Sequence, residues 1–261
     1  MIAAIVQARM GSTRLPGKVL MPAAGRPLLA HLLERLGRSR TVDRIVVATS
    51  VDQRDDPIVA CCESLGVATF RGSESDVLDR YHGAAVSTGA DLIVRVTADC
   101  PLVDPMIVDA MVQYAIDHDG EADLVTNRHP LTFPDGLDLD VIPSASLARA
   151  WREARTGLQR EHVIPYFWDA GLRVHNLEHP ANLYLRHRWT LDYAEDYAVI
   201  RHLIEALCPS HAGSFTMDDL VRYAEQHPEL ARSNAQYIVP QTVPQSGRLL
   251  ALGATPTSVE A

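Results

Sequence analysis

The sequence predicts an α/β fold with a mostly parallel sheet flanked by helices. Short apolar runs alternate with helix-length amphipathic segments through the first half of the chain. This alternation is typical of parallel strands joined by helices that cover both faces of the sheet. The length of 261 residues and the apolar content of 47% allow one large domain. We expect that domain at residues 1–237, followed by a poorly ordered C-terminal tail at 238–261.

The first half of the chain gives the clearest pattern. Its apolar runs predict strands at residues 2–6, 44–49, 67–70 and 92–97. Apolar residues at helical spacing predict helices at residues 27–36, 57–65, 76–87 and 104–118. Proline fits the first turn of a helix, which supports starts near Pro27, Pro57 and Pro105. Asp104 is the expected N-cap of the last helix.

The second half is less regular. We expect strands at residues 123–126, 137–142, 173–177 and, for a short stretch, 189–191. Helices are expected at 144–155, 195–207 and 217–226, with Ser144 as the N-cap of the first. The helical segment 160–169 contains Pro165, so we expect that helix to be broken.

A glycine-containing basic loop directly follows the first strand. It runs from Ala8 to Lys18 and contains three cations, two hydroxyls and two glycines, namely Arg9, Arg14, Lys18, Ser12, Thr13, Gly11 and Gly17. Ligands of α/β sheets bind at the carboxyl ends of strands, and glycines let backbone N–H groups approach an anion closely. The loop therefore predicts a triphosphate site. The alternative is a basic surface loop that binds nothing.

The spacing in this loop excludes two common phosphate motifs. A Walker A motif has four residues between its first Gly and its Gly-Lys pair, followed by Ser or Thr. Here five residues separate Gly11 from Gly17, and Val19 follows Lys18. The dinucleotide pattern Gly-x-Gly-x-x-Gly is also absent from the chain.

Carboxylates at two other strand ends are candidate metal ligands. Asp99 follows the strand predicted at 92–97, and Asp192 follows the one at 189–191. Mg²⁺ prefers carboxylate and phosphate oxygens, so both could face the phosphate loop, although Asp99 could instead cap the next turn. Glu195 and Asp196 have the simpler explanation that acidic residues favour the first turn of a helix. We therefore prefer Asp192 to Asp196 as a ligand.

Composition limits the possible partners. The formal net charge of −9 disfavours duplex nucleic acid or an anionic membrane as the main partner. No apolar run approaches the length of a transmembrane helix, and the N-terminus lacks the features of a signal peptide. The cysteines form no Cys-x-x-Cys pair, which indicates reduced thiols in a cytoplasmic protein. They are Cys61, Cys62, Cys100 and Cys208.

Taken together, six segments resemble one known family. They are Ile5 to Leu20 (IVQARMGSTRLPGKVL), Gly72 to Tyr81, Arg95 to Leu102, Pro134 to Asp138, Arg160 to Tyr166 and Arg188 to Asp196. The chain resembles, over residues 1 to 230, the cytidylyltransferase-like proteins named for spore-coat polysaccharide biosynthesis. These are relatives of the CMP-sugar-acid synthetases for 3-deoxy-octulosonate and acylneuraminate. The resemblance implies a glycosyltransferase-A-like nucleotidyltransferase fold that uses CTP and Mg²⁺.

The resemblance also implies roles for individual residues. The nucleotide phosphates would be held by Ala8, Arg9, Gly11, Ser12, Arg14 and Lys18, and the departing pyrophosphate charge by Arg9, Arg14 and Lys18. The base and ribose would lie near Arg71, Asp76, Arg80, Thr97, Ala98 and Asp99. Asp99 and Asp192 would bind Mg²⁺. The acceptor side would include Arg160, His162, Arg188 and Asp138. Residues 134–151 resemble a small arm through which relatives form homodimers.

The expected reaction is in-line attack of an acceptor oxygen on the α-phosphorus of CTP, with release of pyrophosphate. The acceptor stays open between a sugar acid, another hydroxy acid, and a phosphonate or phosphate compound. A nucleotide-sugar glycosyltransferase would instead bind its metal through Asp138 and Asp140, a weak Asp-x-Asp match whose residues could equally face solvent. The chain could also be a non-catalytic nucleotide-binding protein or one component of a larger assembly.

Overall fold

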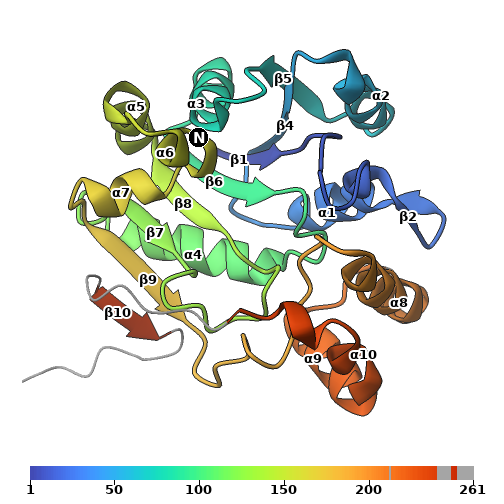
Figure 1. Ribbon diagram of the computed structural model, residues 1–261. Coiled ribbons are helices and arrows are strands. Elements are labelled where there is room, and N and C mark those ends of the chain that lie inside the picture. The colour runs from blue at the N-terminus through green and yellow to red at the C-terminus, as the bar shows by residue number, and fades with distance from the viewer. Residues whose placement is uncertain (212, 240–247, 252–261) are drawn as a thin grey trace, which may run out of the picture.

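The computed structural model describes residues 1–211, 213–239 and 248–251. These residues form one eight-stranded sheet in the order β10-β9-β7-β8-β6-β1-β4-β5, with helices on both faces (Figure 1). Neighbouring strands are parallel except at β8, which runs antiparallel to both β6 and β7. The predicted α/β class with a mostly parallel sheet is confirmed.

The elements of the first half agree closely with their predicted positions. The strands are β1 (Ile2–Gln7), β4 (Arg44–Ser50), β5 (Ala68–Gly72) and β6 (Leu92–Thr97). The helices are α1 (Leu28–Leu36), α2 (Asp56–Ser64), α3 (Val77–Thr88) and α4 (Pro105–Asp117). The Asp104 side chain caps α4 by accepting a hydrogen bond of 2.8 Å from the Met106 N–H. A ribbon of β2 (Pro22–Ala23) and β3 (Arg26–Pro27) before α1 was not predicted.

The second half contains β7 (Leu124–Thr126), β8 (Asp140–Pro143), α5 (Ser144–Glu153), α6 (Gly157–His162), α7 (Pro165–Asp169) and β9 (Val174–Glu178). These are followed by α8 (Ala194–His211), α9 (Met217–Gln226), α10 (Pro228–Ser233), a 3₁₀ turn (Ala235–Tyr237) and β10 (Arg248–Ala251). The predicted break near Pro165 is confirmed, because Val163 between α6 and α7 has a φ of 67°.

Two local predictions in this half are wrong. Residues 189–191 form no strand, because their backbone N–H groups bond to two loops and not to a neighbouring strand. The Trp189 N–H bonds to Asp135 O at 2.5 Å, and the Leu191 N–H bonds to Asp99 O at 2.8 Å. Pro143, rather than Ser144, occupies the N-cap position of α5. The Ser144 hydroxyl instead donates a hydrogen bond to the Ala90 carbonyl oxygen.

The region expected to form a dimerisation arm belongs to the main domain. Within residues 134–151, β8 is a central strand between β6 and β7, and the start of α5 packs against α3. The strand is held there by ladders on both edges, so it does not project from the domain. The expected homodimer therefore stays a prediction without this arm as its support.

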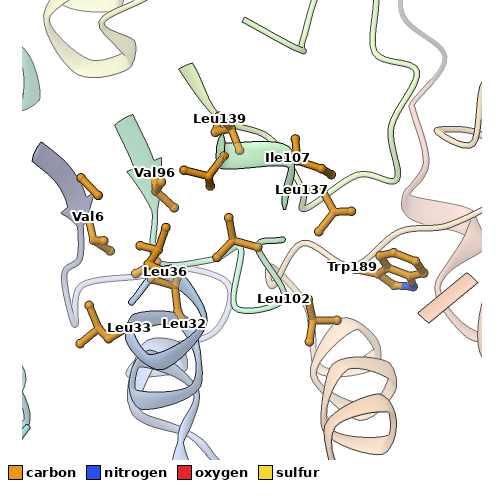
Figure 2. Close-up of a cluster of buried hydrophobic side chains, with 14 of the residues drawn as sticks. Val6, Leu32, Leu33, Leu36, Val96, Leu102, Ile107, Leu137, Leu139 and Trp189 are labelled. Carbon is orange, nitrogen blue, oxygen red and sulfur yellow. The ribbon is translucent and has the colours of Figure 1, made fainter. Parts of the chain in front are cut away.

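Two hydrophobic clusters lie on the two faces of the sheet. On one face, α1 and α4 cover inward-pointing residues of the central strands, and Figure 2 shows Leu32 and Leu36 of α1 in the same cluster as Val6 and Val96. On the other face, α3 and α5 cover the alternate residues, such as Ile5 and Ile93. Burial on both faces explains why the central strands read as continuous apolar runs.

Three remaining expectations concern thiols, membrane spans and the tail. All four cysteines are free thiols. Within the described residues no helix is both long and apolar enough to cross a membrane. Of the expected tail, residues 240–247 and 252–261 lie outside the described residues, while Arg248–Ala251 form β10, which pairs in parallel with β9.

Gly136 allows two loops beside the site to meet. Its φ is +104°, and a Cβ built on it would lie 2.3 Å from the Trp189 carbonyl carbon and 2.4 Å from the Thr190 nitrogen. Only glycine combines this backbone conformation with such a close approach. The contact holds residues 135–138 against the segment 188–192, from which candidate site residues come.

We expect Gly136→Ala to lower the free energy of unfolding by on the order of 3 kcal/mol, because it adds backbone strain and a clash with main-chain atoms. Urea denaturation measures this change. Gly120→Ala is the matched control, because Gly120 also has a positive φ, of +74°, but no atom within 4 Å of an added Cβ. That control should cost about 1 kcal/mol. Equal costs at the two positions would contradict the close approach at Gly136.

Candidate active site

A cavity of about 940 Å³ opens at the carboxyl ends of β1 and β6. One wall is the predicted phosphate loop, the floor is the end of β6, and the far wall comes from the second half of the chain. Twelve predicted site residues line it: Ala8, Arg9, Ser12, Arg14, Lys18, Thr97, Ala98, Asp99, Asp138, His162, Arg188 and Asp192. A strand-end cavity of this kind is the usual ligand position in a parallel α/β sheet.

The phosphate loop is held in place by a carboxylate that the sequence pattern did not single out. Asp55 is buried, and its Oδ1 accepts a hydrogen bond of 2.7 Å from the Met10 N–H. Its Oδ2 accepts hydrogen bonds from Ser50. The loop closes where the Gly17 N–H bonds to Met10 O at 3.0 Å, and Gly17 has a φ of +71°. The loop is therefore anchored to the end of β4 as well as to β1.

Lys18 connects the two candidate metal ligands. Its ammonium group lies 3.0 Å from Asp192 Oδ1 and 3.4 Å from Asp99 Oδ2, and it donates a hydrogen bond of 2.5 Å to Leu191 O. Lys18 is also the only lysine among the 261 residues. The carboxylates at two distant positions in the chain thus meet at one cation from the phosphate loop, as the sequence pattern predicted.

Several cations keep Asp192 ionised. Burial alone would raise the pKa of Asp192, but the nearby charges of Lys18, Arg14 and Arg188 hold that pKa below its ordinary value. Arg14 Nη2 lies 2.9 Å from Asp192 Oδ1. The Arg9 guanidinium, by contrast, lines the cavity and makes no hydrogen bond or ion pair with the described part of the chain. Arg9 is thus available to an anionic ligand without first losing a protein partner.

Asp196 fixes the backbone of Asp192 by accepting a hydrogen bond from its N–H group. Its side chain is 0% exposed and accepts hydrogen bonds from Arg188 Nε at 3.0 Å and Nη2 at 3.1 Å. It also accepts 3.0 Å bonds from the backbone N–H groups of Asp192 and Tyr193 at the start of α8. Asp192 therefore faces the cavity, whereas Asp196 is fully used in holding that helix end.

The far end of the cavity contains a second group of charges. Asp138 is oriented so that its buried Oδ1 has no hydrogen-bond partner, and its Oδ2 lies 3.9 Å from Arg128 Nε. Burial raises the pKa of Asp138 well above its ordinary value, and Arg128 only partly offsets this. Asp135 lies close by, paired with Arg188 Nη1 at 2.7 Å. Asp138 and Arg128 thus have hydrogen-bonding capacity left for a ligand.

The two residues of the Asp-x-Asp match have different surroundings. Asp140 in β8 is fully buried, where it accepts hydrogen bonds from Arg95 at 2.8 Å and Thr126 at 2.7 Å. Asp138 precedes the strand and lines the cavity, whereas Asp140 does not. Among the described residues no group of three or more His, Cys, Asp or Glu is arranged to hold a metal ion. Because Asp140 is buried on Arg95 and Thr126 and does not line the cavity, it is not placed to share a metal ion with Asp138.

Five predicted site residues do not line the cavity: Gly11, Arg71, Asp76, Arg80 and Arg160. Asp76 caps α3 and forms an ion pair of 3.3 Å with Arg160, which also bonds to Trp151 O. Arg71 bonds to two carbonyl oxygens at the end of β4 and to Asp56. Arg80 is buried, with Nε and Nη2 unpartnered. The side chains of Arg71, Asp76, Arg80 and Arg160 thus form contacts within and between α3, α6 and the loops beside the cavity.

Several cavity residues were not predicted from the sequence: Arg95, Arg128, His129, Asp135 and Trp168. Arg128 and His129 lie just after the end of β7, with one residue between, so the strand-end rule that identified Asp99 could have identified them. Arg95 lies within a strand, and its position on the floor depends on its ion pair with Asp140. Asp135 and Trp168 lie outside the strands of the sheet, and the chain offers no comparable signal for them.

The model of the family described as Cytidylyltransferase matches residues 3–208. The chain belongs to the cytidylyltransferase family. It is therefore a nucleotidyltransferase, and its general reaction is transfer of a cytidylyl group from CTP. The match contains the phosphate loop, both candidate metal ligands and the far wall of the cavity.

Curated and solved relatives agree with this assignment. The spore coat polysaccharide biosynthesis protein SpsF of Bacillus subtilis is 37% identical over 209 residues, which cover 77% of this chain and 85% of that protein. A cytidylyltransferase structure from Leptospira borgpetersenii superposes with a TM-score of 0.83 at 31% identity, covering 94% of this chain and 99% of that one. A CMP:2-keto-3-deoxy-manno-octonic acid synthetase complexed with CTP, at 19% identity and a TM-score of 0.62 over 79% of this chain and 99% of that one, shares the fold.

Asp138→Asn tests the burial of the Asp138 carboxyl. Because the folded-state pKa of Asp138 is raised, the folded protein keeps this proton to a higher pH than the unfolded chain does. This carboxyl therefore lowers stability as pH rises from the unfolded pKa toward the raised one. We expect the free energy of unfolding of Asp138→Asn, relative to the wild type, to increase between about pH 4 and about pH 7 in urea denaturation.

The control for this experiment is Asp119→Asn, which removes a carboxylate from an exposed position after α4. Its stability relative to the wild type should change little over the same pH interval, because this exposed side chain is in contact with water in both the folded and the unfolded chain. A flat difference for Asp138→Asn as well would show that Asp138 is not desolvated in the folded protein.

Proposed function

We propose that this cytidylyltransferase transfers CMP from CTP to a small anionic acceptor, with Mg²⁺ and with release of pyrophosphate. One observation carries the proposal: three cations of a single loop and two carboxylates from distant segments line the same cavity. The cations are Arg9, Arg14 and Lys18, and the carboxylates are Asp99 and Asp192. Cations with carboxylates fit a metal-bound polyphosphate better than they fit either component alone.

The phosphate loop is suited to the triphosphate of CTP. Lys18 and Arg14 can exchange their contacts with Asp192 for phosphate oxygens, and Arg9 is available without such an exchange. Guanidinium groups bind phosphate in a bidentate manner, while the ammonium group acts as a compact charge. As pyrophosphate leaves, these groups stabilise the charge that develops on it.

The residues around Lys18 fit a magnesium ion. Asp99 Oδ2, Asp192 Oδ1 and Leu191 O already lie within 2.5 to 3.4 Å of a single cationic group. Mg²⁺ is commonly held by one or two carboxylates together with substrate phosphates, which agrees with two protein ligands at this point. Asp99 and Asp192 would hold the ion. When bound, it supplies charge neutralisation at the reacting phosphate.

The far end of the cavity suits the acceptor. It combines the guanidinium of Arg128 and the imidazole of His162 with the ring of Trp168. In the proposed reaction an acceptor oxygen forms a bond to the α-phosphorus, and the bond from that phosphorus to the bridging oxygen of pyrophosphate breaks. The residues of this chain orient the two substrates and exclude water from between them.

The structure-based case for a glycosyltransferase with an Asp-x-Asp metal site is weaker. Such a site needs both carboxylates to reach one metal ion, whereas Asp140 is buried in contact with Arg95 and Thr126. A protein that binds CTP without catalysis would bind the nucleotide but release no pyrophosphate with any acceptor. Measurement of pyrophosphate release therefore separates a non-catalytic binding protein from the proposed enzyme.

Lys18 allows a direct test of nucleotide binding, because the chain has no other lysine. We expect CTP with Mg²⁺, at about 100 times its Kd, to slow acylation of Lys18 by an amine-reactive ester about tenfold or more. Mass spectrometry of the labelled peptides measures this. The Met1 amino group, which pairs with Asp91 outside the cavity, is the internal control and should label equally with and without CTP. Unchanged labelling of Lys18 would contradict binding at this loop.

Catalysis is tested by pyrophosphate release from CTP and Mg²⁺ with a panel of sugar acids, hydroxy acids and phosphonates. With any acceptor that supports turnover, Lys18→Met and Asp99→Asn should each lower kcat about 100-fold or more, because each removes a preorganised charge contact. Asp117→Asn, at an exposed position of α4, is the matched control and should keep wild-type turnover. Near-normal turnover of both site variants would refute the assignment.

A further inference from the structure

A segment near the C-terminal end packs against the nucleotide end of the cavity, although it lies outside residues 3–208 that match the family model. It comprises Asn234–Val239, after α10. Two of its side chains, Asn234 and Tyr237, reach the start of α8, where Asp192 and Tyr193 lie. Tyr184 adds a third contact, because its hydroxyl donates a hydrogen bond of 2.9 Å to the Val239 carbonyl oxygen.

The Tyr237 ring stacks on the ring of Tyr193, which in turn contacts Arg14 of the phosphate loop. It lies parallel to the Tyr193 ring, with centroids 3.8 Å apart and an interplanar angle of 8°. The guanidinium carbon of Arg14 in turn lies 5.0 Å from the centroid of the Tyr193 ring. The Tyr237 hydroxyl donates a hydrogen bond of 3.2 Å to Glu195 Oε1, which fixes the outer ring of the stack.

Hydrogen bonds provide a second, independent connection. The Asn234 side chain is 1% exposed, and its Nδ2 donates 2.9 Å bonds to Arg188 O and to Asp196 Oδ1. Asp196 also accepts hydrogen bonds from the N–H groups of Asp192 and Tyr193. The segment therefore contacts the same carboxylate that orients the candidate metal ligand.

We propose that Asn234–Val239 is a functional part of the nucleotide site, in which Tyr237 positions Arg14 for the triphosphate by stacking on Tyr193. The inference rests on the proposed binding of CTP at the phosphate loop. The Arg14 side chain is 53% exposed, and two residues restrict it: Asp192, through an ion pair of 2.9 Å, and Tyr193, through its ring and through a hydroxyl that accepts a hydrogen bond of 3.4 Å from Arg14 Nη1. Because the Tyr193 ring is stacked on Tyr237, its own motion is restricted, and it therefore offers the guanidinium of Arg14 a fixed partner. Tyr237 is thus a positioning residue that acts through Tyr193.

The test measures CTP affinity by isothermal titration calorimetry in the presence of Mg²⁺, on the full chain. Tyr237→Ala removes the outer ring, so we expect it to weaken CTP binding about fivefold. Tyr237→Phe keeps the ring and should bind CTP within about twofold of the wild type. Tyr223→Ala is the matched control, because Tyr223 on α9 is also a stacked tyrosine, 4.1 Å from the His227 ring, and lies outside the cavity lining. It should leave CTP affinity unchanged.

A double-mutant cycle identifies the route of the effect. In an Arg14→Met background, Tyr237→Ala should have no further effect on CTP affinity, because the residue that it positions is gone. An equal effect in both backgrounds would overturn the inference, since Tyr237 would then act elsewhere. Wild-type affinity of Tyr237→Ala would also overturn it. If Tyr237→Ala fails to fold, Tyr237→Leu takes its place in the same cycle, because leucine keeps much of the side-chain volume but cannot stack as an aromatic ring.

The same titration separates this inference from the proposed function. If wild-type protein does not bind CTP, the proposed nucleotide site fails, and the role of Tyr237 fails with it. If wild-type protein binds CTP and the Tyr237 variants match it, only the role of the C-terminal segment fails. The expected result is CTP binding by the wild type, weaker binding by Tyr237→Ala, and recovery by Tyr237→Phe.

Discussion

The buried ion pair between Arg188 and Asp196 fixes the positions of side chains at both ends of the cavity. The two carboxylate oxygens of Asp196 accept hydrogen bonds from the Arg188 guanidinium and from the N–H groups of Asp192 and Tyr193, which directly precede α8. These bonds fix the chain at the start of that helix. Arg188 extends from that pair to Asp135 on the far wall, and Asp192 extends toward Lys18. A buried ion pair is weak evidence for stability, but here it fixes the positions of groups that come from three separate segments.

Charge balance distinguishes the end of the cavity that we propose for the acceptor from the end that we propose for the nucleotide. At the acceptor end, Arg95 and Arg188 each have a carboxylate within 2.8 Å, whereas Arg128 lies 3.9 and 4.0 Å from its nearest carboxylates. A guanidinium with long contacts and an unpartnered Nε can take an anionic group without breaking a hydrogen bond. Arg128 is therefore the cation of this wall best able to bind the small anionic acceptor that we propose.

Sequence patterns located the phosphate loop and Asp99 on the cavity because both follow regular parallel strands. Apolar runs located β1 and β6, and parallel strands end at one edge, so Lys18 and Asp99 could be expected to meet. The acceptor end depends on β8, the antiparallel strand whose pairing partners are distant in sequence, and on irregular connections. The spacing of residues in the sequence does not indicate that Arg160 pairs with Asp76 instead of lining the cavity. Side chains such as Arg71 and Arg80 match a family motif, but their orientation depends on tertiary contacts.

The division between the two ends also has a physical reason. A triphosphate requires several cations at fixed spacing, and a short loop after a strand supplies them with few degrees of freedom. An acceptor is recognised by side chains on longer connections, and these need a constraint to hold their shape. Gly136 provides one by allowing residues 135–138 to pack directly on the backbone of Trp189 and Thr190. The segment 188–192 is therefore held at two points: by the contact with Gly136 and by the hydrogen bond from Asn234 to Arg188 O. Because Asp192 lies at the end of this segment, the same contacts that fix the far wall also fix the position of Asp192.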